Sequence, residues 1–216
     1  MNDKNDKFSG FNDVISDLSQ IREIMGGEPP HTVLDKELDE LDEVCKKIIA
    51  KSPFIVIASS DSKGCPDVSP KGDPIGFVKI LDDKHLAIPD RPGNRRADTF
   101  QNIIENPYLS IIFIIPGKGE TLRVTGEVRI VRDEPLRNSM AVNGKAPKFA
   151  IVMHIEKIII HCPKCIVRAK LWEPDQWPDH SDTANIAEAM LVHAKLDMTM
   201  EELGRHAEDE GFTELY

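Results

Sequence analysis

The first fifty residues carry apolar side chains at the spacing of amphipathic helices. One set ends at Gly26-Gly27 and predicts a first helix with a glycine C-terminal cap; its members are Phe11, Val14, Ile15, Leu18, Ile21 and Met25. A second set follows the EPPH linker and ends before Ser52-Pro53; its members are Leu34, Leu38, Leu41, Val44, Cys45, Ile48 and Ile49. We therefore expect a helical N-terminal extension over residues 1–50.

From residue 54 the pattern changes to short, β-branched apolar runs separated by turns. Strands are expected at 54–60, 67–71, 75–81, 85–89, 109–115, 121–131 and 149–161. Residues 121–131 alternate apolar and polar side chains with a period of two, so one face of this strand is exposed to solvent or lines a site. Strands joined mostly by short turns, with one helix inserted, indicate an antiparallel barrel rather than a Rossmann-type sheet.

Helical patterning returns at residues 182–210, where Thr199 and Glu202 have the spacing of a capping box. The expected fold class is therefore mainly β with flanking helices (α+β). We expect three parts: the helical extension 1–50, a barrel domain over 51–175, and a helical C-terminal extension over 176–216.

The charge of the 216-residue chain is strongly uneven. The net charge of −10 lies entirely in residues 173–216, which hold 12 Asp/Glu and 2 Lys/Arg, whereas residues 1–172 carry 25 of each sign. No broad basic stripe is available to neutralise phosphates, so nucleic acid is not an expected partner. The sequence leaves open whether the acidic helices embrace a partner subunit or cover a site.

The longest apolar run, Leu109 to Ile115, is too short to span a bilayer. The first residues, MNDKNDKFSG, are polar and lack the apolar core of a signal peptide. We therefore expect a cytoplasmic protein with no membrane partner.

Only one pair of the four cysteines, Cys162 and Cys165, has a spacing that suggests chemistry. Together with His161 and His154 the pair could ligate zinc, but a structural zinc site usually has two paired knuckles, and the other cysteines are far away in the sequence. A redox CxxC pair would need a thioredoxin-like βα context. We expect two partly buried thiols at a strand end, and no metal.

Neither a phosphate loop nor a nucleophilic triad is evident. The PGKGET turn at 116–121 lacks the P-loop spacing and falls in a hairpin. No serine lies in a GxSxG elbow. The sequence therefore identifies no catalytic residue.

An unusual group of arginines follows the strand at 85–89. Ala97, Phe100, Ile103 and Ile104 predict a helix that begins near Asn94 and ends at Asn106-Pro107. Arg95 and Arg96 would then lie in its first turn, where the helix dipole disfavours cations. Arg91 lies just upstream. Either the three arginines are solvated or paired with Asp90 and Asp98, or a bound phosphate offsets their charge. The stretch 67–78, with Ser69, Lys71 and a glycine-rich kink, favours a phosphate-bearing flat cofactor.

Several stretches resemble the pyridoxamine 5′-phosphate oxidase-like flavoproteins, and more closely a bacterial subgroup of FMN-dependent proteins. These stretches are SPF (52–54), DVSPKGDPIGF (67–77), IPDRPGNRRADTFQNI (88–103), IIPGKGETLRVTGEVRI (114–130) and HCPKCIVRAKLW (161–172). The resemblance spans roughly residues 30–175 and follows the family order. It implies a split β-barrel that binds FMN at the interface of a homodimer.

The resemblance also implies roles for individual residues. Arg95 and Arg96 would bind the FMN phosphate, with Asn94 at the helix start. Ser69 and Lys71 would lie on the strand under the flavin, and the backbone of Ile88, Pro89 and Asp90 beside the isoalloxazine ring. Thr121 and Arg123 would lie on the strand at the flavin edge, and Arg168 and Trp172 would come from the other subunit.

The chain departs from the parent oxidase after residue 172, where WEPDQWPDH and an acidic tail replace the Arg-rich segment that closes over pyridoxal phosphate. We therefore expect an FMN-dependent oxidoreductase that acts on another small molecule, or exchanges hydride with NAD(P)H. One alternative is a non-catalytic FMN-binding protein that stores flavin or acts as a sensor. Another is a split barrel that has lost flavin and binds haem or a different cofactor. The intact NRR and SPKGD stretches argue against this alternative.

Overall fold

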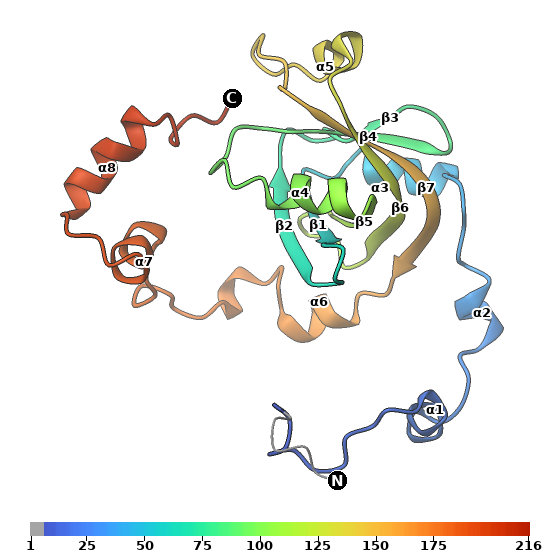
Figure 1. Ribbon diagram of the computed structural model, residues 1–216. Coiled ribbons are helices and arrows are strands. Elements are labelled where there is room, and N and C mark those ends of the chain that lie inside the picture. Colours follow the sequence, from blue (N-terminus) through green and yellow to red (C-terminus); the bar gives the residue numbers. More distant parts are fainter. Residues whose placement is uncertain (1–6) are drawn as a thin grey trace. The chain divides into compact units, whose positions relative to one another are not determined.

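The computed structural model describes residues 7–216, and the chain divides into two units after Lys36 (Figure 1). The first unit contains helices α1 (Leu18–Met25) and α2 (His31–Leu34). Asp17 starts α1 by accepting a hydrogen bond from the Ser19 main-chain N–H, and Gly26 ends it in the left-handed conformation. The sequence predicts the glycine cap but not the start at Asp17. The predicted helix was too long, because the stretch from Phe11 to Ile15 precedes the Asp17 cap.

The second predicted helix is also interrupted. Helix α3 covers only Glu43–Ile49, because the Asp42 carboxylate caps it by accepting a hydrogen bond from the Cys45 N–H at 2.7 Å. Leu38, which was expected to be helical, instead exchanges main-chain hydrogen bonds with Ile158. The apolar periodicity of this stretch is therefore divided between a β-bridge and a helix.

The second unit is built on one antiparallel seven-stranded sheet with the order β2-β1-β5-β6-β7-β4-β3 (Figure 1). Its strands are β1 (Phe54–Ser60), β2 (Pro66–Gly72), β3 (Lys79–Ile80), β4 (His85–Pro89), β5 (Tyr108–Ile114), β6 (Thr121–Val131) and β7 (Ala150–His161). Among the described residues β2 and β3 form the two edges of the sheet, which is not closed. The predicted antiparallel split barrel with helical extensions is thereby confirmed.

One strand is much shorter than predicted. Only Lys79–Ile80 of the stretch 75–81 pairs as β3. Gly76 has a φ of +75°, and a side chain there would meet the Ala50 main-chain oxygen at 2.9 Å. Together with Pro74, this left-handed glycine places a turn at residues 75–76, so β3 begins only at Lys79.

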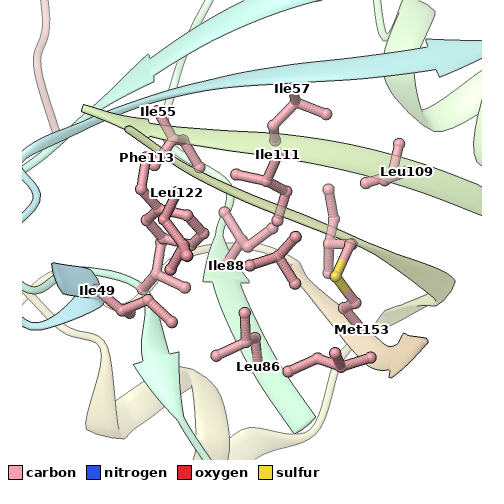
Figure 2. Packing of buried hydrophobic residues seen from close by; sticks show 14 of the residues in the cluster. Ile49, Ile55, Ile57, Leu86, Ile88, Leu109, Ile111, Phe113, Leu122 and Met153 are labelled. Atoms are coloured by element: carbon pink, nitrogen blue, oxygen red, sulfur yellow. The ribbon is translucent and has the colours of Figure 1, made fainter. Parts of the chain in front are cut away.

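The core lies on one face of the curved sheet (Figure 2). Directly paired residues in an antiparallel sheet project to the same face. One such row runs across four strands, and each of its side chains is at most 1% exposed: Ile57, Ile111, Val124 and Ile158. Phe113, Leu122 and Leu86 continue the same buried cluster from β5, β6 and β4. The period-two pattern of the sequence thus corresponds to one buried face.

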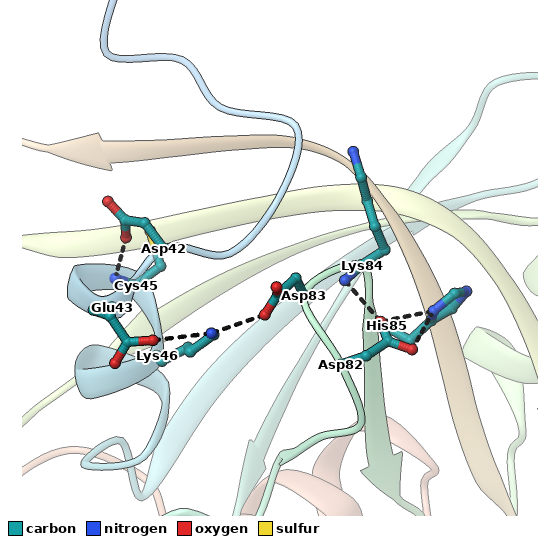
Figure 3. Close-up of polar contacts among 8 residues, drawn as sticks. All are labelled: Asp42, Glu43, Cys45, Lys46, Asp82, Asp83, Lys84 and His85. Carbon is teal, nitrogen blue, oxygen red and sulfur yellow. Dashed lines mark hydrogen bonds and ion pairs between the residues drawn. The ribbon is translucent and has the colours of Figure 1, made fainter.

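Helix α3 is attached to the β3–β4 turn by polar contacts as well as by burial (Figure 3). Lys46 Nζ lies 3.0 Å from Glu43 Oε1 and 2.8 Å from Asp83 Oδ1. Cys45, Ile48 and Ile49 of the same helix are buried in the core cluster. Leu41 and the buried residues of α3 therefore belong to the core cluster of the sheet.

The remaining helices are α4 (Asp98–Glu105), α5 (Glu134–Ser139), α6 (Lys164–Ala169), α7 (Ile186–His193) and α8 (Met200–Asp209), with a 3-10 turn at Pro174–Gln176. The predicted capping box at Thr199 and Glu202 is confirmed at the start of α8. Asn185 and Glu188 form a second one at the start of α7. The predicted domain limits at 50 and 175 stay predictions.

Candidate functional site

A cleft of about 1020 Å³ lies between strand β2, the loop 90–97 that follows β4, and residues 145–149. Residues 208–216 contribute the remaining wall. One wall of the cleft is thus the edge strand β2. Another wall is the loop that follows β4, the neighbour of the opposite edge strand β3. Its volume is at the upper end of that of small-molecule and cofactor sites.

Strand β2 presents polar side chains to this cleft. Asp67, Ser69 and Lys71 are half-buried and alternate with exposed Val68 and Pro70. All five line the cleft in part. The predicted pair Ser69 and Lys71 therefore lies on one face of the strand.

The loop 90–97 corrects the predicted start of the following helix. Helix α4 begins at Asp98, because Ala97 has a left-handed φ of 60° and Arg95 one of 61°. Asn94 does not cap the helix; its Oδ1 accepts a hydrogen bond from the Arg96 main-chain N–H at 3.1 Å. Arg95 and Arg96 therefore precede the helix, and Asp98 takes the favourable acidic position in its first turn.

Both arginines lie in the cleft wall and are held by carboxylates. Arg96 Nε lies 2.7 Å from Asp98 Oδ2, which is the pairing that the sequence left open. Arg95 Nη1 lies 2.9 Å from Glu210 Oε2, and Arg95 Nη2 donates to the Glu210 main-chain oxygen. The Arg95 guanidinium also lies 5.0 Å from the centre of the Phe212 ring.

Arg91 has a structural role that the sequence did not show. Its Nε lies 2.6 Å from Asp73 Oδ2, and the Asp73 side chain is only 1% exposed. The Tyr216 hydroxyl donates to the other Asp73 oxygen at 3.0 Å, and Arg91 also donates to the Met140 oxygen. A buried carboxylate needs such partners, so Arg91 stabilises the GDP kink at 72–74.

Asp90 places a partly buried carboxylate in the cleft. Burial raises its pKa, although Lys71, Arg91 and Lys148 act in the opposite direction. Its main-chain N–H donates to the Phe149 oxygen at 3.0 Å. This N–H is therefore engaged within the protein, and only the carbonyl and side chain of Asp90 are left for a ligand.

The other predicted residues are not in the cleft wall. Ile88 and Pro89 are buried in β4, so only their backbone could meet a ligand. Thr121 and Arg123 lie on β6, Arg168 is exposed on α6, and Trp172 Nε1 donates to the Lys118 oxygen at 2.8 Å. Within one chain the structure does not bring these four side chains to the cleft, and their roles stay predictions.

The structure adds residues that the sequence did not single out: Asp73, Lys145, Lys148, Glu210, Phe212 and Tyr216 line the cleft or anchor its walls. The sequence did hold a signal for two of them: Asp73 lies in the glycine- and proline-containing kink at 72–76, and Glu210 lies in the acidic tail. The pairing of these residues over more than a hundred positions had no local signal.

The CPKC motif is more exposed than predicted. Cys162 and Cys165 are both exposed free thiols, because they flank the start of the surface helix α6. Within residues 7–216, no group of three or more His, Cys, Asp or Glu side chains is arranged to hold a metal ion. The same residues contain no helix that is both long and apolar enough to cross a bilayer.

Comparison with known proteins identifies one family model. Residues 41–162 match the model described as pyridoxamine 5′-phosphate oxidase, a range that contains all seven strands and more than half of the chain. No curated protein matches the sequence.

Solved structures with a similar fold share low sequence identity. HupZ from group A Streptococcus is 23% identical, with a TM-score of 0.46 over 55% of this chain and 91% of its own. An FMN-binding protein from Syntrophomonas wolfei is 15% identical, with a TM-score of 0.43 over 66% and 92%. A pyridoxamine 5′-phosphate oxidase-related, FMN-binding protein from Nostoc punctiforme is 13% identical, with a TM-score of 0.39 over 55% and 78%.

Proposed function

Because the chain belongs to the pyridoxamine 5′-phosphate oxidase family, we propose that its cleft binds FMN. The observation that carries this proposal is that Arg95 and Arg96 line the same cleft as Ser69 and Lys71 of β2. Two guanidinium groups suit a phosphate dianion, since each can donate a pair of parallel hydrogen bonds. The cleft is also large enough for a flat ring system beside the phosphate.

The exposure of the two arginines supports a ligand-binding role. The Arg95 side chain is 65% exposed and that of Arg96 is 70% exposed. Ion pairs this exposed contribute little to folding. The two side chains are therefore available for exchange between a protein carboxylate and a ligand phosphate, whereas Arg91 is committed to the buried Asp73.

We propose further that the protein is an oxidoreductase that acts on a small molecule or on NAD(P)H. Bound FMN would supply hydride transfer through its isoalloxazine ring. Lys71 would place a positive charge beside that ring, which favours a reduced, anionic flavin, and Ser69 would offer a hydroxyl for orientation. The parent oxidase reaction is not proposed, because the Arg-rich segment is replaced.

The proposed active form is a homodimer. The second face of the sheet carries the paired row Val56, Ile112, Arg123 and Ile159, all half-exposed. The Arg123 Nε is buried without a hydrogen-bond partner among residues 7–216. A second chain on this face would cover the apolar side chains, and it could also provide the missing acceptor.

FMN binding by purified protein tests the cofactor proposal. We expect bound flavin in the absorption spectrum. Arg95→Ala should weaken FMN binding by about tenfold or more, because it removes a charge-assisted contact with the phosphate. Titration of FMN fluorescence measures the dissociation constant. Arg129→Ala is the matched control, since Arg129 is 63% exposed but lies on β6 outside the cleft wall.

The outcomes separate the proposals. FMN bound with equal affinity by wild type and Arg95→Ala would contradict the phosphate assignment. Bound FMN that neither NAD(P)H nor a panel of small-molecule donors reduces would favour flavin storage or sensing. Protein that binds no flavin would overturn the cofactor proposal and leave the fold unaffected.

A further inference from the structure

Residues 208–216, which we call the covering segment, occupy the proposed phosphate site by contacting Arg95. Glu210 contacts both terminal nitrogens of Arg95, one through its side chain and the other through its main-chain oxygen. Phe212 lies against the same guanidinium. A carboxylate of the chain thus occupies the side of Arg95 that a ligand phosphate would need.

The covering segment is also attached at its other end. The Tyr216 hydroxyl donates to Asp73, its ring lies 5.5 Å from the Arg91 guanidinium, and its main-chain oxygen accepts from Lys145 Nζ at 2.7 Å. These contacts are made to two separate walls of the cleft. The position of Glu210 is therefore supported by anchors beyond its own ion pair.

Charge complementarity supports the same arrangement. The part of the cleft wall contributed by residues 67–151 contains six Lys/Arg and three Asp/Glu, whereas the covering segment contributes four Asp/Glu and no Lys/Arg. Four acidic residues of the tail therefore line the same cleft as a wall with more basic than acidic residues. Opposite charges on two surfaces fix their register and select between ligands.

We propose that Glu210 is an internal competitor that determines which anions the cleft accepts, an inference that rests on the proposed function. A monocarboxylate ligand would exchange one carboxylate for another and lose the advantage of a tethered group. A phosphate monoester carries about −1.5 to −2 charges and three acceptor oxygens, so it forms more contacts with Arg95 and Arg96 than Glu210 does. The cleft therefore selects phosphate esters.

The Arg95–Glu210 pair is weak enough to be displaced. The Arg95 side chain is 65% exposed and that of Glu210 is 43% exposed, and exposed ion pairs are screened by water and salt. A ligand phosphate can replace Glu210 without leaving a buried charge unpaired. Displacement of Glu210 therefore frees the covering segment from Arg95.

The test measures FMN and riboflavin binding by wild type, Glu210→Gln and Glu214→Gln. Glu214 is the matched control, because it is in the same segment and lines the cleft, but its side chain makes no ion pair within residues 7–216. Glu210→Gln should tighten FMN binding by about two- to fivefold, the range of one exposed ion pair. Riboflavin, which lacks the phosphate, should change less. Glu214→Gln should tighten FMN binding less than Glu210→Gln does, because it removes a cleft charge but no contact with Arg95.

A double-mutant cycle separates competition from a general charge effect. With Arg95→Ala as background, Glu210→Gln should no longer tighten FMN binding, because its competitor role acts through Arg95. Hydrogen exchange of residues 208–216 should rise when FMN binds to wild type. Equal effects of Glu210→Gln and Glu214→Gln, or unchanged exchange on FMN binding, would overturn the inference.

Failure of the proposed function is distinguishable from failure of this inference. If neither wild type nor Glu210→Gln binds FMN, the cofactor proposal fails. Inorganic phosphate then decides the inference alone: faster exchange of residues 208–216 in its presence supports competition at Arg95, and unchanged exchange overturns it.

Discussion

At the scale of single residues, the cleft holds one carboxyl whose environment opposes its charge. Burial raises the pKa of Asp90 even though Lys71, Arg91 and Lys148 favour its ionised form. The folded protein therefore binds a proton at Asp90 more readily than the unfolded chain does. By linkage, ionisation of Asp90 reduces stability as pH rises from about 3.8, the ordinary value, through the raised pKa.

Asp90→Asn removes this ionisation and should raise the melting temperature at pH 7 relative to wild type. The gain should shrink as the pH falls below 3.8, where the carboxyl is protonated in both states. Thermal unfolding followed by circular dichroism at several pH values measures the difference. A gain that does not depend on pH would contradict the role given to burial.

Asp39→Asn provides a control of opposite sign. A hydrogen bond from Lys84 lowers the pKa of Asp39, so the ionised form stabilises the fold above pH 3.8 and this contribution is lost as the pH falls. The substitution should therefore lower stability at pH 7, and only slightly, because the pair is exposed.

At the scale of elements, the long pair β6–β7 depends on one glycine. The register of this pair shifts between Thr125 and Gly126, as at a β-bulge. A side chain added at Gly126 would overlap the main-chain oxygen of His154 on β7. The close approach of the two strands, rather than a positive φ, requires glycine at this position.

Gly126→Ala should destabilise the protein by about 3 kcal/mol or more, since overpacking against backbone cannot be relieved by a rotamer change. Urea unfolding measures the loss in the free energy of unfolding. Gly204→Ala is the control, because nothing lies within 4 Å of the added carbon in α8 and alanine favours a helix. Equal stability of the two variants would contradict the close-approach argument.

At the scale of the whole molecule, one face of the sheet carries the buried core, and the other face carries a row of half-exposed apolar side chains. The second face includes Val56, Ile112 and Ile159, around the buried and unpartnered Nε of Arg123 within the described chain. Apolar side chains that stay partly exposed side by side on a sheet face are suited to burial in a protein interface. This face is where we place the second subunit of the proposed homodimer.

Ile112→Lys should convert the homodimer to monomer, because it places a charge at the centre of the apolar row. Sedimentation equilibrium measures the change. Ile104→Lys is the control, since Ile104 is 78% exposed on α4 and does not belong to this sheet face. A wild-type protein that is monomeric at high concentration would contradict the proposed dimer.

The sequence by itself determined the places of the strands other than β3, their buried face, the glycine cap that ends α1 and the capping box of α8, because alternation and capping are local signals. Its motifs also identified the family, and they predicted a site to which Ser69, Lys71, Asp90, Arg95 and Arg96 belong; these five residues line one cleft in the structure. Only the tertiary structure showed that α4 starts at Asp98, where the left-handed conformation of Ala97 separates the arginines from the helix.

The tertiary structure also decided the partners of the cleft residues. Arg95 meets Glu210, which is 115 positions away, and Asp73 meets Tyr216, which is 143 positions away. No periodicity or spacing encodes such pairs. Each pair depends on which distant segments of the chain meet at the cleft beside the edge strand β2. Local side-chain preferences therefore specify the elements, and the packing of those elements specifies which charges face one another.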